Sequence, residues 1–277
     1  MDNAVAHRSL VRRYFDYVGH QWLAFIDTLQ GVGAFALITL GVTVTKFRES
    51  HRVVHPLIRQ QVMRAGVGLL PFVFFLGASL GLVVIGQTVA LLTKVGTTEF
   101  IGVVMDTVVF RELGPLAAAL MVLGRVGTAT VVELGTKRAQ GEIEALEALG
   151  IDPVHYLVVP RVIGLSLAIF SLTVYLIMVV VFSGLLFAFI TDVPISPGEY
   201  FGQVVAGLSY RDFAFVATKT ICFGIIISIV TCFHGLAQPI RLEQVPIAAT
   251  KAVSQSVTGC LVLDGIFIIL YILLGPA

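Results

Sequence analysis

Charged residues interrupt a long apolar stretch near the middle of the sequence, among them Arg111, Glu112, Arg125 and Glu133. Ionisable groups are costly in such surroundings and usually face a cavity, a partner or one another. Arg111 and Glu112 are adjacent, so on a helix their side chains point about 100° apart and each needs a partner elsewhere. One interpretation is a set of interhelical ion pairs that includes Lys219 or Asp264. The other is that Arg111 offers its guanidinium fork to a lipid phosphate at the rim of a cavity.

The neighbourhood of this charged pair carries further signals. Pro115 is expected to kink the helix and to free backbone groups that a cavity could use. Arg125 and Glu133 lie about two turns apart on a similar face, and we expect them to join a structural network rather than to contact a substrate. Gly77 and Gly81 form a GxxxG pair, and Gly114, Gly124 and Gly127 also indicate close helix approach, either between copies of the chain or within one chain.

Catalytic and metal-binding patterns are missing from the sequence. His51 and His55 have the i,i+4 spacing of a ligand pair, but no Glu follows the first His and no third ligand is evident. Nucleotide-binding and GxSxG motifs do not occur either. Cys222, Cys232 and Cys260 lie in apolar stretches and are expected to be small buried hydrophobes. We therefore expect no catalytic residue, no metal and no directly bound cofactor.

The segment that follows Glu133 predicts a short amphipathic helix at about 140–152. Ile143, Leu146 and Leu149 recur at three-residue spacing between acidic residues, and a glycine and an Asp-Pro turn end the helix. Such a helix is either a solvated connector or a rigid element that docks in a groove of a soluble ATPase. The candidate coupling residues are Glu142, Glu144, Ala145, Leu146, Glu147, Leu149, Gly150 and Asp152.

Composition places these segments in a membrane protein. Of the 277 residues, 57% are hydrophobic and 13% are charged, and the mean hydropathy is +0.96. The net charge of +1 gives no basic field for nucleic acid. A membrane-spanning helix needs roughly 20 apolar residues. Five stretches satisfy this requirement, at about 66–92, 100–134, 158–190, 213–236 and 252–274.

The first 60 residues are different in character. Arg8, Arg12 and Arg13 alternate with aromatic residues up to Trp22, as in a helix that lies along the membrane surface. Residues 22–44 are apolar but broken by glycines and polar residues, so a re-entrant or sixth spanning segment is the alternative. We expect no cleaved signal peptide and no transit peptide, which favours a bacterial inner membrane.

Basic residues predict the orientation of the chain. With a cytoplasmic N-terminus, Lys94 and Arg211 alone lie on the far side, and the segments 137–157 and 237–251 are cytoplasmic. The basic residues then on the cytoplasmic side are Arg8, Arg12, Arg13, Lys46, Arg48, Arg52, Arg59, Arg64, Lys137, Arg138, Arg161, Arg241 and Lys251.

Several motifs together resemble the MlaE/YrbE permease family. The resemblance is specific over about residues 100–165 and looser over the rest of the chain, and residues 144–150 also resemble the EAA loop of ABC importer permeases. The motifs are RELGPLAAALMVLGRVG at 111–127, ELGT at 133–136, EALEALGIDP at 144–153 and VVPR at 158–161.

The family resemblance implies a function and a set of partners. It implies a homodimer of permeases, each with an interfacial N-terminal helix and five spans, two cytoplasmic MlaF-like ATPases that use ATP, and MlaD-like MCE-domain proteins on the far side. The transported substrates are phospholipids or related lipids. Carried over by position, the resemblance places Val84, Leu91, Leu92, Glu112 and Leu113 in a lipid pocket at the dimer interface.

We therefore predict an all-α integral membrane protein with an N-terminal interfacial region (1–60) and a permease domain (61–277). Its predicted function is that of the noncatalytic membrane subunit of an ATP-driven lipid transporter. The alternatives are a secondary transporter or channel for a hydrophobic substrate, which should show paired repeats with broken helices, and an intramembrane enzyme, which lacks its set of catalytic residues.

Overall fold

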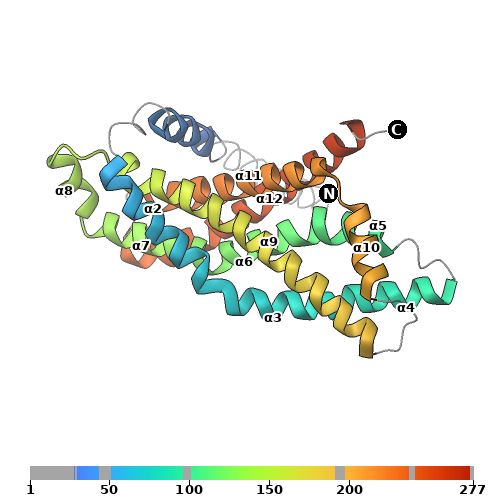
Figure 1. Ribbon diagram of the computed structural model, residues 1–277. Coiled ribbons are helices and arrows are strands. Elements are labelled where there is room, and N and C mark those ends of the chain that lie inside the picture. The colour runs from blue at the N-terminus through green and yellow to red at the C-terminus, as the bar shows by residue number, and fades with distance from the viewer. Residues whose placement is uncertain are drawn as a thin grey trace, which may run out of the picture.

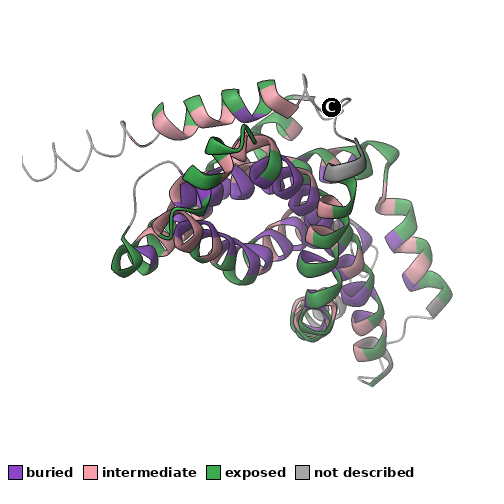
Figure 2. Ribbon diagram, turned by 90° about the vertical axis from the view of Figure 1, so that its left-hand side faces the viewer, coloured by how far each residue is buried: buried purple, intermediate pink, exposed green. Residues whose placement is uncertain are grey.

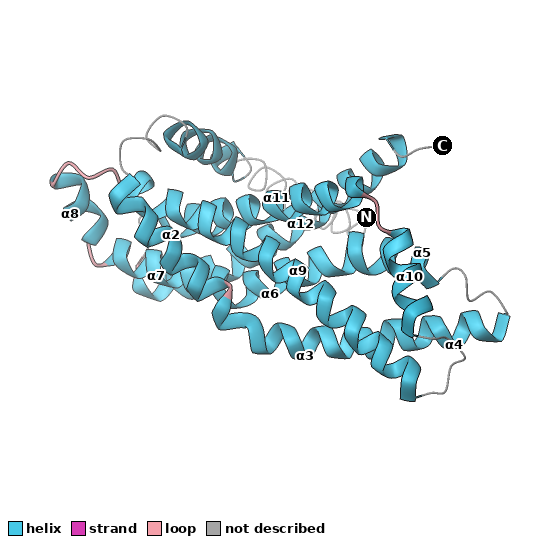
Figure 3. Ribbon diagram, viewed as in Figure 1, coloured by secondary structure: helices cyan, strands magenta, loops and turns pink. Residues whose placement is uncertain are grey.

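The computed structural model describes residues 28, 30–43, 51–95, 101–190, 197–236 and 241–274. These residues form helices and no strand (Figure 3). Five helical segments among them are long and apolar enough to cross a membrane: His55–Thr88, Met105–Ala139, Val154–Phe187, Tyr210–Leu236 and Leu242–Leu273. The predicted all-α membrane fold with five spans is therefore confirmed. The surface helix expected around residues 8–22 lies outside the described part of the chain.

The first two spans are each built from several helical pieces. The first contains α2 (His51–Ala65), the 3-10 turn η1 (Val67–Leu69), α3 (Leu70–Leu80), the π-helical segment η2 (Gly81–Ile85) and α4 (Gly86–Val95). The second contains α5 (Ile101–Val104), the π-helical segment η4 (Met105–Leu113), α6 (Gly114–Val122), the π-helical segment η5 (Leu123–Gly127) and α7 (Thr128–Ala139).

The other three spans are more regular, and two short helices lie outside them. The third span contains η6 (Val154–Val158) and α9 (Val159–Ile190), the fourth is α11 (Tyr210–Leu236), and the fifth contains η7 (Leu242–Gln244) and α12 (Val245–Leu274). The short helices are α8 (Glu142–Ala148) and α10 (Pro197–Gly207).

Helix ends extend beyond the apolar stretches. The first candidate span begins at His55 and the fifth at Leu242, whereas hydropathy alone suggested residues 66 and 252. Polar residues at the end of a helix lower the hydropathy but do not interrupt the backbone hydrogen bonds, so the helix continues past the apolar core.

The first span bends between α2 and α3 (Figure 1). Pro71 has no backbone N–H, so it cannot donate to the carbonyl of Val67 as a regular helix requires. The N–H of Leu70 donates to this carbonyl instead, which tightens the chain into the 3-10 turn. The bend turns α3 away from the direction of α2.

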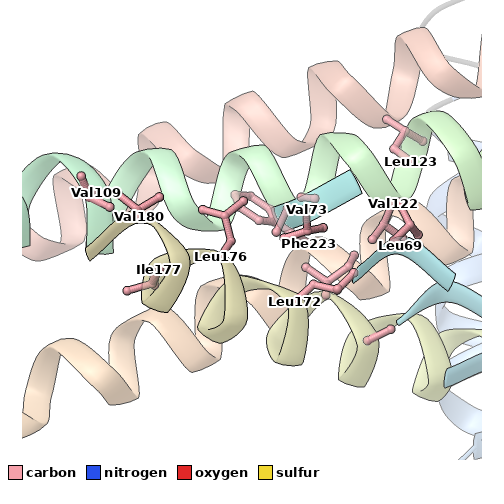
Figure 4. Packing of buried hydrophobic residues seen from close by; sticks show 14 of the residues in the cluster. Leu69, Val73, Val109, Val122, Leu123, Leu172, Leu176, Ile177, Val180 and Phe223 are labelled. Atoms are coloured by element: carbon pink, nitrogen blue, oxygen red, sulfur yellow. The ribbon is translucent and has the colours of Figure 1, made fainter. Parts of the chain in front are cut away.

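Helix α9 is the centre of the hydrophobic core. It packs against α2, α3, α6 and α11, and the buried faces of the spans point inward when the bundle is viewed from its α8 end (Figure 2). Side chains from four spans meet there, among them Val73, Val122, Leu172 and Phe223 (Figure 4).

Glycines allow α9 to approach its neighbours closely. A Cβ at Gly77 would lie 3.0 Å from Val179 of α9. The GxxxG motif of the first span therefore serves packing within one chain, as the simpler interpretation predicted. Gly124 does not bring two helices together within one chain, because a Cβ there would meet nothing within 4 Å.

The helix Gln30–Thr43 packs against α11 near its C-terminal end. The ring centroids of Phe35 and Phe233 lie 5.9 Å apart, and Val32 and Ala36 contact the same buried cluster. The described part of this helix lies across the axis of the bundle (Figure 2). This direction fits an interfacial helix better than a sixth span.

Helix α10 lies between the third and fourth predicted spans. Tyr200 is buried, and its hydroxyl donates to the carbonyl of Val181 at 3.2 Å. Burial raises the pKa of the Tyr200 phenol, so it remains a protonated donor. In the sequence, the four-residue spacing of Tyr200 and Val204 was the signal for this helix. Both residues are buried in the structure.

The closest contact between α9 and α11 supplies a test of the fold. A Cβ at Gly224 would press on the backbone and side chain of Ser166, so Gly224→Ala should destabilise the protein by about 1–3 kcal/mol through overpacking. We expect its unfolding temperature in detergent to fall by several degrees. Gly265→Ala in α12 is the matched control, because a Cβ there meets nothing within 4 Å. Equal unfolding temperatures for the two variants would contradict this packing.

Candidate functional site

Arg111 is held by two acidic side chains from different spans. Its Nη2 donates to Asp106 within η4 and lies 3.1 Å from Oδ1 of Asp212 at the start of α11. The guanidinium carbon lies 4.0 Å from the ring centroid of Tyr271 of α12, a cation–π contact. Asp106 and Asp212 are both buried. Sequence analysis named neither of them as a partner for Arg111.

Lys219 is the centre of a second group of charges. It is fully buried in α11, and its Nζ lies 2.7 Å from Oε2 of Glu112 and 2.6 Å from Oδ1 of Asp264. Glu112 therefore has the ion-pair partner that one of the two interpretations proposed. The same Nζ donates to the carbonyl of Arg111 at 2.9 Å. Pro115, four residues later, has no N–H to donate to this carbonyl.

Together these residues tie three spans to one another. The second, fourth and fifth spans each contribute to both groups of charges, at the end of the bundle away from α8 (Figure 1). Each cation has two carboxylates, which is the arrangement that makes buried charge tolerable.

A third network joins the first three spans near α8. Glu133 of α7 lies 2.8 Å from Arg161 of α9, 3.1 Å from Arg64 of α2 and 3.5 Å from Lys137. Glu133 thus takes part in a structural network, as expected. Arg125 does not belong to it and instead donates to the carbonyl of Gly68 at 2.8 Å.

An apolar groove runs between the first and second spans. Its volume is about 570 Å³, and Arg125 is the one charged residue that lines it. Phe72 and Leu120 on its walls are 56% and 38% exposed. The lining residues are Leu69, Phe72, Leu76, Ala117, Leu120, Met121, Gly124 and Arg125.

The six residues predicted to bind lipid are not gathered in this groove. Val84 and Leu113 line a separate narrow gap at the contact with α9, which has no room for a water-sized molecule. Leu92 is half-buried against the core, whereas Leu91 is exposed. Arg111 and Glu112 are engaged in the ion pairs described above. A shared lipid pocket for these residues remains a prediction.

Sequence reasoning missed the groove, although its signal was present. Leu69, Phe72 and Leu76 recur at three- and four-residue spacing, and Ala117, Leu120 and Gly124 repeat the pattern on the second span. In a membrane protein nearly all spans are apolar all round, so a stripe of this kind does not identify which face is hollow.

The short helix α8 is closed by hydrogen bonds at its C-terminal end. It ends in a Schellman motif, in which Ile151 N–H donates to the Leu146 carbonyl at 3.0 Å and Gly150 N–H to the Glu147 carbonyl at 2.9 Å. Gly150 has the required positive φ of 76°. Asp152 then accepts from the N–H of Val154 at 3.0 Å and so caps the third span.

The apolar residues of α8 face two directions. Ile143 is buried, and Leu146 packs against the same cluster, so both anchor the helix to the bundle. Leu149 is 76% exposed and Ile151 is 40% exposed. The apolar surface available to a partner therefore consists of Leu149 and Ile151 rather than the whole predicted ridge. Exposed coupling candidates beside them are Glu142, Glu144, Ala145, Glu147 and Gly150.

Comparison with known proteins identifies the family. The permease MlaE family model matches residues 58–270. The chain belongs to the MlaE permease family. The resemblance drawn from the motifs is thereby confirmed, and the chain is a multi-pass membrane protein of the ABC transporter permease class. This class disfavours the secondary-transporter and intramembrane-enzyme alternatives.

Relatives of this MlaE-family permease occur in bacteria and in a plant. It is 31% identical over 207 residues to "Protein TRIGALACTOSYLDIACYLGLYCEROL 1, chloroplastic" of Arabidopsis thaliana, across 74% of this chain and 58% of the relative. It is 31% identical over 235 residues to a "Probable ABC transporter permease protein" of Rickettsia felis, across 83% of this chain and 88% of the relative. The chain thus spans a little over half of the plant protein and most of the rickettsial one.

The buried lysine gives a direct test of the charge networks. Lys219→Met should leave Glu112 and Asp264 without a cation and cost about 3–5 kcal/mol. We expect little folded protein after extraction from membranes, measured by gel filtration. The triple variant Lys219→Met/Glu112→Gln/Asp264→Asn removes the orphaned charges and should recover part of the yield. A Lys219→Met protein as stable as the unmodified chain would rule out this role of the ion pairs.

Proposed function

We propose that this MlaE-family permease moves phospholipids or related lipids between the inner and outer membranes of a bacterium. In this proposal it works as a dimer with a cytoplasmic ATPase and an MCE-domain protein. The observation that carries the proposal is the apolar groove between the first two spans, because an apolar recess open to the side suits an acyl chain.

The size and lining of the groove support a lipid substrate. Pockets that bind small molecules occupy roughly 300–1,000 Å³, and the groove has about 570 Å³. Its walls are apolar except for Arg125. The plant relative is named after trigalactosyldiacylglycerol, which is a lipid. A lipid with a polar headgroup matches this combination better than a small polar solute does.

The short helix α8 supports contact with a separate ATPase. The sequence contains no nucleotide-binding motif, so ATP must be used by another chain. Leu149 and Ile151 present an apolar patch, and the Schellman motif that ends α8 fixes the direction in which the chain leaves the helix. Such a helix fits a groove on a partner and can convey the movement of that partner to the spans.

The distribution of charge supports a cytoplasmic position for α8. Arg64, Lys137, Arg138 and Arg161 all lie at its end of the bundle. An excess of basic residues marks the cytoplasmic side of a membrane protein. With this orientation the N-terminus is cytoplasmic, and the MCE-domain protein meets the opposite end, where α10 lies.

Filling the groove tests the lipid assignment. Gly124→Leu adds a side chain where a Cβ meets nothing within 4 Å, so it should occupy the groove without disturbing the core. We expect transfer of a fluorescent phospholipid from proteoliposomes containing the assembled complex to fall at least several-fold. Gly265→Leu makes the same change in α12, also in open space, and should leave transfer unaltered. Normal transfer by Gly124→Leu would remove the groove from the lipid pathway.

The exposed Leu149, which directly follows α8, provides a test of the ATPase contact. Leu149→Glu places a charge in the apolar patch without altering the buried side of the helix, so the permease should fold normally but lose most of its co-purifying ATPase. Tyr210→Glu at the opposite end, where Tyr210 is 86% exposed, is the control. If ATPase recovery and ATP-dependent transfer survive Leu149→Glu, coupling through α8 is wrong.

A further inference from the structure

Arg125 is an exposed cation within the second span. It lies in the π-helical segment η5, eight residues before Glu133, which corresponds to about 12 Å along the helix. The Glu133 network contains the basic residues that mark the α8 side of the membrane. Arg125 therefore lies well inside the apolar layer, where an unpaired charge is costly.

The hydrogen-bond partners of Arg125 do not neutralise its charge. Its Nη1 donates to the carbonyl of Gly68 at 2.8 Å. Within the described ranges no carboxylate lies within 4 Å of it, whereas Arg111 and Lys219 each have two. A guanidinium has five N–H donors in a planar fork. Most of these donors thus remain available for an external acceptor.

Within the described ranges, the candidate spans of a second copy offer no unpaired carboxylate for Arg125. Asp106, Glu112, Glu133, Asp212 and Asp264 are the acidic residues inside these spans, and each is already paired with a cation. The one other acidic residue of the candidate spans, Glu243, lies at the extreme end of the fifth. The described spans therefore supply no counter-charge for Arg125.

The surroundings of Arg125 define the kind of ligand that would supply it. The residue lies at the groove, where Gly124 leaves open space beside it and apolar side chains of Phe72, Leu76 and Leu120 form the walls. A ligand that suits both Arg125 and the apolar walls has an anionic group that can accept two hydrogen bonds from the guanidinium, and this group is joined to an apolar chain. Phosphate oxygens have this geometry.

We propose that Arg125 binds the phosphodiester of a phospholipid whose acyl chain occupies the groove. This assignment rests on the proposed lipid-transport function and adds a headgroup requirement to it: the permease selects lipids that carry a phosphate. Arg125 and its bond to Gly68 also place the phosphate next to the bend of the first span. A neutral lipid with the same chains would fill the groove but leave the cation unpaired.

The test uses the full-length protein in phosphatidylcholine nanodiscs and two photoreactive probes. One probe is phosphatidylglycerol with a diazirine in its acyl chain, and the other is diacylglycerol with the same chain and no phosphate. Labelling of α6 residues is measured by mass spectrometry for the unmodified protein, Arg125→Gln, Arg125→Lys and Arg241→Gln. Arg241 is an exposed arginine outside the groove and serves as the matched control.

We expect the unmodified protein and Arg241→Gln to favour the phospholipid probe by about tenfold, as a charge-assisted hydrogen bond predicts. Arg125→Gln should bring the two probes to equal labelling, so that the ratio of phospholipid to diacylglycerol labelling falls from about ten to about one. Arg125→Lys should retain part of the preference, because it keeps the charge but loses the fork. Excess inorganic phosphate should not displace the phospholipid probe.

Several results would overturn the assignment. A phospholipid preference that survives Arg125→Gln, or one that inorganic phosphate abolishes, would contradict it while leaving the lipid groove intact. Dissociation of a dimer by Arg125→Gln, with unchanged lipid preference in the monomer, would assign Arg125 to a subunit contact instead. If neither probe labels α6 in the unmodified protein, the groove itself does not hold lipid, and the proposed function fails at that step together with this assignment.

Discussion

Burial of Lys219 is the constraint on which the half of the bundle away from α8 depends. A fully buried ammonium group requires opposite charges close by, and Glu112 and Asp264 provide them from two other spans. Its third bond reaches a backbone carbonyl to which Pro115 cannot donate. The proline, the lysine and the two acids therefore form one arrangement, in which each feature would be destabilising without the others.

Much of this arrangement follows from the amino-acid sequence, but not all of it. Hydropathy and charge predicted five spans, and the rarity of charge in hydrocarbon marked Arg111 and Glu112 as residues that need partners. Lys219 and Asp264 were recognisable as partners because they too are isolated in apolar segments. Asp212 was not, because it lies just before the predicted fourth span, where an acidic residue is unremarkable. Asp106 lies within the predicted second span, so the same rule would have marked it, but it was not named from the sequence.

The groove and the orientation of α8 depend on contacts between segments far apart in the sequence, and the sequence did not reveal these contacts. Two helices that are apolar on all sides can pack with many different rotations about their own axes, and the π-helical segments change these rotations further. The rotation of the second span decides whether Gly124 faces a neighbouring helix or open space, and in the structure it faces open space beside the groove. For α8, periodicity predicted the helix and its glycine cap, but which apolar residues face the bundle was decided by the position of the second and third spans.

The carboxylate of Glu133 joins the ends of the first three spans. It holds Arg64, Arg161 and Lys137 at once, so the ends of three spans are clamped at one point. Helix α8 is joined covalently to two of those spans and is anchored to them by Ile143. In the proposed coupling, movement of α8 therefore reaches the ends of three spans together, and the bend beside Pro71 lies further along the first of them.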